Sequence, residues 1–271
     1  MSQEKVALVT GVSSGIGQVI ATVLSRRGFR VFGTMRRPEG GGPLGAVELV
    51  RLDVRDEESV RGCVRTVLGQ VGRIDSLVNN AGCTLIGSLE ETSIEEAKQI
   101  FETNFFGALR VSQAALPVMR KQGYGRIVNI GSMVGFLPAP YQAIYAATKH
   151  ALEGYSESLD HEVRQFGIRV SVVEPGFTRT NIDRNAQLAS QPLVAYAVER
   201  HQVVDAVRQN NANGKDPAEV ASVVLEALTS RTPRLRYLVG REARFIAWLR
   251  KFAPDSLFDK GLRKQFKLMS A

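Results

Sequence analysis

The chain has 271 residues, of which 44% are hydrophobic and 23% charged, the composition of an ordinary globular protein. Its two cysteines, Cys63 and Cys83, form no C-x-x-C pair and have no histidine cluster beside them, which argues against a disulfide scaffold or a metal site. The net charge of +8 comes from scattered arginines, so we expect no nucleic-acid partner. Without a signal peptide or an apolar run of ~20 residues, we expect a cytoplasmic protein with no transmembrane segment.

Short apolar strands alternate with helices along the whole chain. Because the strands are almost wholly apolar, we expect them to be parallel and covered on both faces. The pattern predicts one α/β domain over residues 1–271, built as a doubly wound parallel sheet with helices on both faces. The predicted strands span 5–10, 29–35, 47–52, 74–79, 126–130, 168–174 and 236–239, and the helices 16–27, 56–70, 93–121, 143–166 and a last one opened by Asp216-Pro217.

A glycine-rich turn, residues 10–17, follows the first predicted strand and opens the first helix. Glycine permits a tight turn and close approach to a pyrophosphate, while the helix N-terminus offers unpaired N–H groups to an anion. A plain strand–helix turn that binds nothing is the alternative. The context favours a dinucleotide phosphate site formed by Gly11, Ser13, Ser14, Gly15, Ile16 and Gly17.

The end of the second predicted strand bears on the choice of cofactor. An NAD site of this topology places an acidic residue there, but the chain has Met35, followed by Arg36 and Arg37. A guanidinium binds a 2′-phosphate with charge-assisted hydrogen bonds. The sequence therefore predicts NADP (NADPH) rather than NAD, with Arg36 the first candidate and Arg37 the second. Alternatively, both arginines are solvated loop charges.

Tyr145 and Lys149 stand one turn apart on the helix predicted over 143–166, so their side chains share one face. An ammonium nearby, together with the positive ring of an oxidised nicotinamide, is expected to lower the pKa of the Tyr145 phenol. Ser132 ends the fifth strand, thirteen residues before Tyr145. Asn104 lies in the long helical region. Taken singly, Ser132 also fits a strand-end cap, and Asn104 a helix kink or a buried hydrogen-bonding group.

In this order and spacing, the motifs resemble the short-chain dehydrogenase/reductase family over about residues 4–240. The glycine turn matches its T-G-x-x-x-G-x-G pattern, residues 79–82 its N-N-A-G, and 175–178 its P-G-x-x-T. The resemblance implies a Rossmann-type sheet of seven strands in the order 3-2-1-4-5-6-7. It also implies an NAD(P)-dependent enzyme acting on CH–OH and C=O groups, assembled as a homodimer or homotetramer. A looser similarity to hydroxysteroid and retinol dehydrogenases rests on segments 33–37, 52–56 and 151–154.

The resemblance also implies individual roles. Ser132 and Tyr145 would bind the substrate oxygen, with Tyr145 as acid/base, while Lys149 would lower the tyrosine pKa and bind the nicotinamide ribose. Asn104 would hold a water in a proton relay to Lys149. Asp53 would hydrogen-bond the adenine amino group, or else act as a turn or N-cap residue. The remaining expected cofactor positions are Val54, Asn80, Ala81, Gly82, Pro175, Gly176 and Thr178; Glu174 stands where the family often has Asn and is given no role.

The apolar segment 134–140 joins Ser132 to Tyr145 and is expected to line the substrate side, beginning with Val134. This favours a hydrophobic ketone or secondary alcohol of steroid, retinoid or lipid type. A reductase of carrier-bound 3-oxoacyl chains and a non-catalytic nucleotide sensor remain the alternatives. Residues 179–215 are expected to form a mobile substrate lid.

Residues 241–271 form the C-terminal tail, which contains a basic amphipathic stretch over 243–252. Such a helix can touch a membrane surface. We expect it instead to pack on its own domain or on a partner, which is the commoner arrangement.

Overall fold

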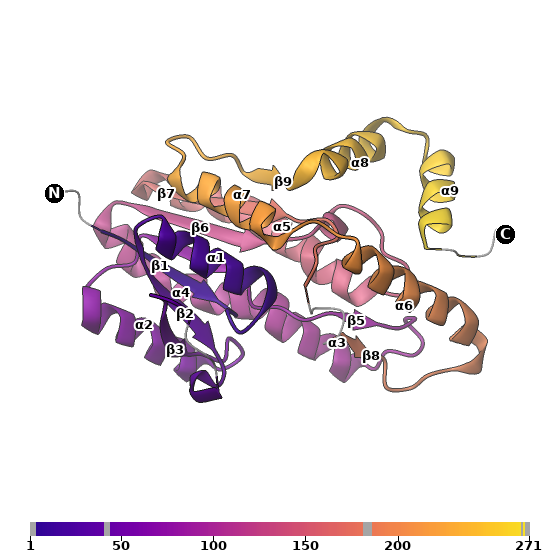
Figure 1. Ribbon diagram of the computed structural model, residues 1–271, viewed down its shortest axis with the longest axis horizontal. Helices are drawn as coiled ribbons and strands as arrows, with labels where there is room; N and C mark the ends of the chain where they lie inside the picture. Colours follow the sequence, from indigo (N-terminus) through magenta and orange to yellow (C-terminus); the bar gives the residue numbers. More distant parts are fainter. Residues whose placement is uncertain (1–3, 41–43, 181–185, 267, 269–271) are drawn as a thin grey trace.

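The computed structural model describes residues 4–40, 44–180, 186–266 and 268. Within them, one parallel sheet has seven strands in the order β3-β2-β1-β4-β6-β7-β9, which confirms the predicted doubly wound sheet and its strand order (Figure 1). The strands of the sheet are β1 (Lys5–Thr10), β2 (Phe29–Met35), β3 (Glu48–Arg51), β4 (Ser76–Asn79), β6 (Gly125–Ile130), β7 (Ile168–Glu174) and β9 (Arg236–Leu238). Two strands that the sequence did not predict, β5 (Leu85–Ile86) and β8 (Gln187–Leu188), pair with each other outside it; two residues are too few to show periodicity.

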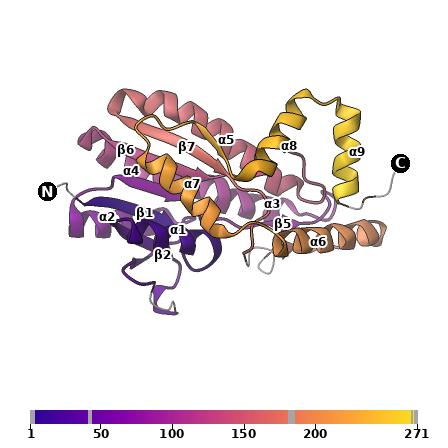
Figure 2. The same ribbon diagram turned by 45° about the horizontal axis from the view of Figure 1, so that its top comes forward.

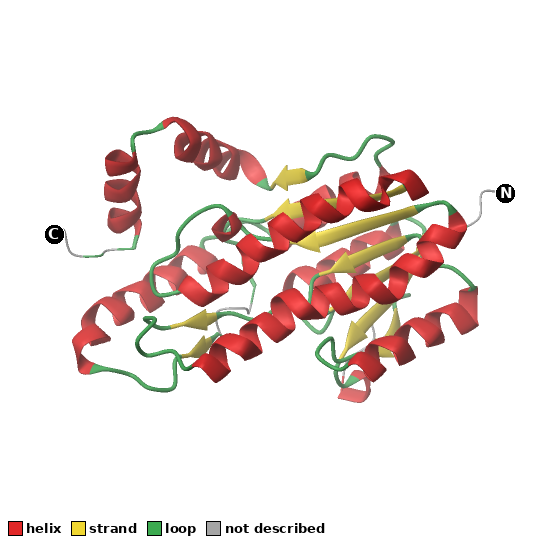
Figure 3. Cartoon of the chain, turned by 180° about the vertical axis from the view of Figure 1, so that it is seen from behind, coloured by secondary structure: helices red, strands yellow, loops and turns green. Residues whose placement is uncertain are grey.

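Helices cover both faces of the sheet. Hydrophobic side chains of α1 and α7 pack on one face, in front in Figure 1, and those of α2, α4 and α5 on the other, seen from behind in Figure 3. The helices are α1 (Gly15–Arg26), α2 (Glu57–Val71), α3 (Ile94–Phe101), α4 (Gly107–Gln122), α5 (Ala143–Val163), α6 (Ala197–Ala212), α7 (Pro217–Thr229), α8 (Gly240–Phe252) and α9 (Asp255–Gln265). Short 3-10 turns are η1 (Pro38–Gly40), η3 (Met133–Gly135), η4 (Arg164–Phe166) and η5 (Val194–Tyr196).

Strand β1 shows why the sheet is a central layer. Ala7 and Val9 belong to the hydrophobic cluster under α1 and α7, whereas Val6 and Leu8 belong to the cluster under α2, α4 and α5. Alternate side chains therefore bury on opposite faces, as the continuous apolar run predicts. The strand order reverses between β1 and β4, so the crevice at the carboxyl ends of these strands is where a ligand of this fold binds.

The helix predicted over 93–121 is divided. A capping box of Ser93 and Glu96 starts α3, and a π-helical segment, η2 (Glu102–Phe106), separates α3 from α4. The π-turn carries Asn104, and α4 begins at Gly107, where a Cβ atom would lie 2.7 Å from Val54 Cγ2. Hydrophobic periodicity alone does not reveal the extra residue of a π-turn, because the segments before and after it are both helical. Such π-turns often mark functional positions.

The C-terminal third is more helical than the sequence predicts. Asp216 caps α7, as expected, by accepting a hydrogen bond from the N–H of Ala218. Helix α6 lies within the predicted lid over 179–215, of which 181–185 lie outside the described residues. Helix α9 was not predicted, and α8 and α9 stand away from the sheet in both Figure 1 and Figure 2. Among the described helices, none is long and apolar enough to cross a bilayer.

Candidate active site

The loop between β1 and α1 is shaped by two glycines with positive φ, Gly11 (+71°) and Gly15 (+62°), a backbone region that favours glycine. Helix α1 begins at Gly15, and the side chain of its N-cap residue, Ser14, makes no capping hydrogen bond. The first N–H groups of the helix therefore remain available at the positive end of its dipole. This cradle fits the pyrophosphate of a dinucleotide, the role expected for residues 11–17.

Asn80, which follows β4, fixes the shape of this loop. Its Nδ2 donates to the carbonyl oxygens of Thr10 and Gly11, at 2.9 Å each, and its own N–H donates to Thr10 Oγ1 at 3.0 Å, as does the N–H of Ala81. A Cβ atom on Gly17 would lie 2.3 Å from both Asn80 Nδ2 and Gly11 O. The sequence marked Asn80 as a cofactor residue; the structure shows that its side chain holds the glycine loop.

At the end expected to hold adenine, Asp53 is engaged within the chain. Both of its carboxylate oxygens accept from the Arg55 guanidinium, at 3.0 and 2.7 Å, and these hydrogen bonds hold the pKa of Asp53 below its usual value. An adenine amino group would therefore compete with Arg55 for this carboxylate. The alternative that Asp53 is a turn residue is confirmed, because its Oδ1 accepts from the N–H of Arg55 at 3.0 Å. Asp53 does not cap α2, because Asp56 is the capping residue and accepts from the N–H groups of Glu58 and Ser59.

The two arginines after β2 are exposed. In the described part of the chain, neither Arg36 nor Arg37 has an ion-pair or hydrogen-bond partner. The charge of Arg36 contributes to the lowered pKa of Asp53, so its guanidinium lies near that carboxylate. Both side chains are accordingly available for an anion beside the ribose position.

Ser132, Tyr145 and Lys149 converge where β6 ends. The Ser132 hydroxyl shares a hydrogen bond with the Tyr145 phenol, and it also accepts from the N–H of Val134 at 3.3 Å. Lys149 Nζ lies 5.8 Å from the centroid of the Tyr145 ring and donates to the carbonyl oxygen of Ile130 at 2.8 Å. The structure thus brings together Tyr145 and Lys149, which the helix spacing placed on one face, and Ser132, which the resemblance assigned to the same site.

Burial governs the electrostatics of Tyr145 in the chain alone. Desolvation raises the pKa of Tyr145 to about 12, and the hydrogen bond with Ser132 opposes it only in part. Lys149 is itself buried and directs its ammonium at a backbone carbonyl, and the lowering of the tyrosine pKa that is expected with an oxidised nicotinamide bound stays a prediction. Its desolvation lowers the pKa of Lys149 to about 8. In the chain alone, the phenol therefore keeps its proton at neutral pH.

Asn104 uses its side chain to fix the segment after β4. Its Oδ1 accepts from the N–H of Cys83 and its Nδ2 donates to the Cys83 carbonyl oxygen, both at 2.8 Å. The same Nδ2 lies 3.2 Å from Thr148 Oγ1, on the helix that carries Lys149. A Cβ atom on Gly82 would lie 3.3 Å from Asn104 Oδ1. Asn104 thereby joins the N-N-A-G segment to α5, and the water relay implied by resemblance stays a prediction.

The loops after β6 and β7 pack edge to edge. The N–H of Met133 donates to the Pro175 carbonyl oxygen at 3.0 Å, and a Cβ atom on Gly176 would lie 2.9 Å from Met133 Sδ. The hydroxyl of Thr178 donates to the Gly176 carbonyl oxygen at 3.0 Å, which leaves its lone pairs able to accept from a carboxamide. This places Pro175, Gly176 and Thr178 beside the segment that carries Ser132.

A buried acidic pair behind this site was missed by the sequence analysis. Glu174 ends β7 and Glu153 lies on α5; both are almost wholly buried, and Arg236 Nη1 contacts both, at 2.9 Å from Glu174 Oε1. Burial, with the Glu153 charge next, raises the pKa of Glu174 to about 8. A Cβ atom on Gly135 would collide with Glu153 Oε1, so the pair supports the turn that follows Ser132.

This pair predicts an unusual pH dependence of stability. Since folding raises the pKa of Glu174 from 4.5 to about 8, its contribution is complete below the lower value and is lost as pH rises through the higher one. Between about pH 5 and about pH 8, we expect the free energy of unfolding to fall by about 1 kcal/mol per pH unit, and Glu174→Gln to flatten this slope. Urea titrations across this pH range measure it.

The control is Glu157→Gln. Glu157 also pairs with Arg236, at 2.6 Å, but its carboxylate is 40% exposed. This variant is expected to keep the wild-type slope. Parallel stability curves for the wild type and Glu174→Gln would show that Glu174 does not titrate in this range.

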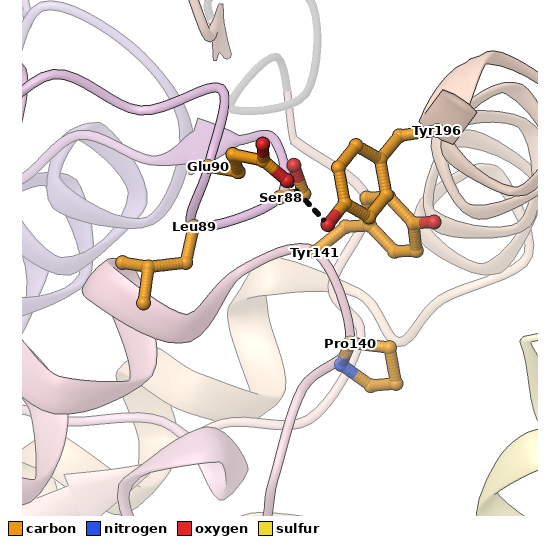
Figure 4. A pocket seen from close by; sticks show the side chains of 6 residues that line it. All are labelled: Ser88, Leu89, Glu90, Pro140, Tyr141 and Tyr196. Carbon is orange, nitrogen blue, oxygen red and sulfur yellow. Dashed lines mark hydrogen bonds between the residues drawn. The ribbon is translucent and has the colours of Figure 1, made fainter. Parts of the chain in front are cut away.

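A cleft of about 520 Å³ opens on the side of the loop that precedes α5 (Figure 4). Tyr141 has a positive φ of 59° and donates from its hydroxyl to Glu199 Oε2 at 3.0 Å, while the Tyr196 hydroxyl donates to Glu90 Oε2 at 2.9 Å. Neither Ser132 nor Tyr145 lines this cleft. The lining residues are Ser88, Leu89, Glu90, Pro140, Tyr141 and Tyr196.

Only part of the apolar segment 134–140 is available to a substrate. Leu137 and Ala139 are buried in the protein, whereas Val134 is half-buried and Pro140 reaches the cleft. The expectation that the whole segment lines the substrate side is therefore too broad, because alternate residues of this turn pack inward.

Comparisons with known proteins agree with this geometry. A family profile described as short chain dehydrogenase matches residues 5–191. The 3-ketodihydrosphingosine reductase of Bacteroides thetaiotaomicron is 35% identical over 264 residues, which cover 96% of this chain and 97% of the relative. A short-chain dehydrogenase structure from Streptomyces avermitilis has a TM-score of 0.81 and 37% identity, covering 98% and 97% of the two chains. A short chain dehydrogenase/reductase from Burkholderia phymatum, solved with NAD, has a TM-score of 0.78 and 25% identity, covering 93% and 96%.

Proposed function

The chain belongs to the short-chain dehydrogenase/reductase family, and from this premise we propose that it uses NADP(H) to interconvert a hydrophobic ketone and its secondary alcohol. The family assignment makes the chain an NAD(P)-dependent oxidoreductase of CH–OH and C=O groups. The observation that carries the proposal is the convergence of Ser132, Tyr145 and Lys149 at the end of β6, beside the glycine loop. A protein that only sensed nucleotides would need none of the three.

The site acts by holding and releasing one proton. The nicotinamide supplies or accepts the hydride at the substrate carbon when it is bound. The hydroxyls of Ser132 and Tyr145 hold the substrate oxygen, and Tyr145 gives its proton to that oxygen as the C=O bond becomes C–OH. The Lys149 ammonium, 5.8 Å from the ring centroid, then stabilises the phenolate left behind. A phenol that is protonated at neutral pH suits the reductive direction.

NADPH is supported by the charge at the end of β2. A 2′-phosphate placed here would meet the exposed guanidinium groups of Arg36 and Arg37 instead of a carboxylate. Guanidinium groups bind phosphate bidentately, which gives both energy and geometry.

Replacing Arg36 tests this choice of cofactor. Because one charge-assisted contact to phosphate is lost, we expect Arg36→Ala to raise the Kd for NADPH about 10- to 100-fold and to leave that for NADH unchanged. Fluorescence titration of each cofactor measures both values. The matched control is Arg27→Ala. Arg27 is an exposed arginine at the C-terminal end of α1, and the glycine loop lies at the N-terminal end of this helix. Equal losses for NADPH and NADH would contradict a role in 2′-phosphate binding.

The hydrophobic substrate is supported by a relative and by the position of Val134. The name of the Bacteroides relative specifies a keto group on a sphingoid base, and the half-buried Val134 donates its N–H to the Ser132 hydroxyl, so an apolar residue adjoins the catalytic serine. Turnover with NADPH across long-chain, steroid and retinoid ketones, compared with small polar sugars, tests the substrate class. Faster turnover of the sugars would overturn it.

A further inference from the structure

Helix α8 presents an aromatic stripe to solvent. Phe245, Trp248 and Phe252 are 60%, 56% and 62% exposed, although each is a large apolar side chain. Their rings form a continuous row, with centroids 6.3 Å apart for the first pair and 5.6 Å for the second. The spacing of three and four residues places all three on one face.

This face points away from the protein. The only fully buried residue of α8 is Ala243, which lies opposite the aromatic stripe on the helix wheel. An ordinary surface helix buries its apolar face and exposes its polar one, whereas α8 exposes its aromatic face. Of the two expected arrangements, packing on its own domain or on a partner, the first is therefore wrong for the aromatic residues, and the second stays a prediction. A contiguous exposed apolar face marks a binding surface.

Basic residues surround the stripe. Residues 240–266 contain seven basic and three acidic side chains, a net charge of +4. Arg241, Arg244 and Lys251 are exposed on α8 itself. Aromatic side chains flanked by arginine and lysine are typical of segments that lie in the interface of an anionic membrane.

The second helix of the pair connects this surface to the cleft. Leu262 of α9 and Phe266, which caps its C-terminus, pack in one hydrophobic cluster with Val203 and Val207 of α6, and Tyr141 packs against the same cluster. Tyr141 also lines the cleft. The inner side of α9 thus supports the cleft wall, while α8 extends outward from the fold (Figure 2).

We propose that the aromatic face of α8 docks on the surface of an anionic phospholipid bilayer. Phe245, Trp248 and Phe252 enter the boundary between headgroups and acyl chains, and the flanking cations contact lipid phosphates. A second copy of the chain is a poorer occupant, because a symmetric pairing of this face would bring like charges together. The inference rests on the helix face and stands apart from the proposed reaction.

Trp248 is the single tryptophan of the chain, so its fluorescence reports on this face alone. With vesicles of phosphatidylglycerol and phosphatidylcholine, its emission should shift to shorter wavelength, and brominated acyl chains should quench it. Vesicles of phosphatidylcholine alone should have a much weaker effect. An emission unchanged by anionic vesicles, with no co-sedimentation of the protein, would overturn the proposal.

Substitutions separate the two contributions. Phe245→Ser with Phe252→Ser should weaken vesicle partitioning at least about tenfold, and each of Arg241→Gln, Arg244→Gln and Lys251→Gln about fivefold. Ile94→Ser, which removes a 70% exposed apolar residue from α3, is the control and should bind as the wild type does.

Two other outcomes refute docking on lipid. A blue shift that grows with protein concentration without vesicles, together with a doubled mass in light scattering, would assign the face to a second copy. Equal partitioning of the wild type and the double phenylalanine variant would also refute docking on lipid, because it would show that the aromatic stripe does not contact the bilayer. Turnover of a short, water-soluble ketone should be the same in every variant, so this result is independent of the proposed reaction.

Discussion

Tyr145→Phe should lower kcat for ketone reduction about 10³-fold, the usual effect of removing a general acid. The ring stays in place, and the lost hydrogen bond to Ser132 should cost only about 1 kcal/mol of stability. The variant is therefore expected to fold and to bind NADPH as the wild type does. Stopped-flow single turnovers, combined with cofactor titration, distinguish lost chemistry from lost binding.

Tyr155→Phe provides the control on the same helix. Tyr155 is half-buried, shares a hydrogen bond with Ser112, and packs edge-on against Phe105, away from Ser132. Its hydroxyl has no place in the proposed chemistry, so kcat should remain within about twofold of the wild type, since most substitutions outside the site change little. If Tyr145→Phe kept the same kcat as Tyr155→Phe, the proton given to the substrate oxygen would have to come from a donor other than Tyr145.

Gly17→Ala is the second change for which we expect a large effect, because it should abolish cofactor binding at ordinary concentrations. The added Cβ would lie 2.3 Å from the backbone oxygen of Gly11, which cannot move without displacing the loop that Asn80 holds. A displacement of about 1 Å at a binding cradle costs about 10²-fold in function, and overpacking of this kind costs about 1–3 kcal/mol of stability. Isothermal titration with NADPH and thermal unfolding measure the two effects.

Gly62→Ala is the matched comparison, since it makes the same chemical change in another helix. Nothing lies within 4 Å of a Cβ atom built at Gly62 in α2. This variant should gain about 0.5–1 kcal/mol from the helix propensity of alanine and bind NADPH normally. If Gly17→Ala behaved in the same way, the close approach of α1 to the loop would not be needed for binding.

The fold was predictable because its pattern is local and repeated. In β1, four successive apolar residues predict a strand covered on both faces, and Asp216-Pro217 predicts the start of α7. The strand order depended on the resemblance, since no strand specifies its neighbour by its own composition. The π-turn at Asn104 was invisible because it is set by contacts with Cys83 and Thr148, which lie far away in the sequence.

The site was predictable in its residues and less so in their electrostatics. Spacing placed Tyr145 beside Lys149, but burial determines their pKa values, and burial is a property of the packed fold. The acidic pair escaped notice for the same reason. Glu153 and Glu174 come from different elements and meet only where Arg236 of β9 joins them.

The raised pKa of Tyr145 has a functional consequence. A buried phenol with a raised pKa keeps its proton at neutral pH, as ketone reduction requires, and the oxidative direction should need the positive charge of the oxidised cofactor to lower this pKa. Lys149, whose pKa is lowered to about 8, loses its charge above that pH and then stabilises the phenolate less. Both effects favour ketone reduction near neutral pH.

The most direct test of the central claim follows the hydride itself. NADPH that carries deuterium at the nicotinamide C4 position would be incubated with the protein and a long-chain ketone, and the product analysed by mass spectrometry. The account predicts an alcohol with one deuterium on its carbinol carbon, formed about 10³-fold more slowly by Tyr145→Phe. An alcohol without deuterium, or labelled alcohol formed at the same rate by both proteins, would contradict it.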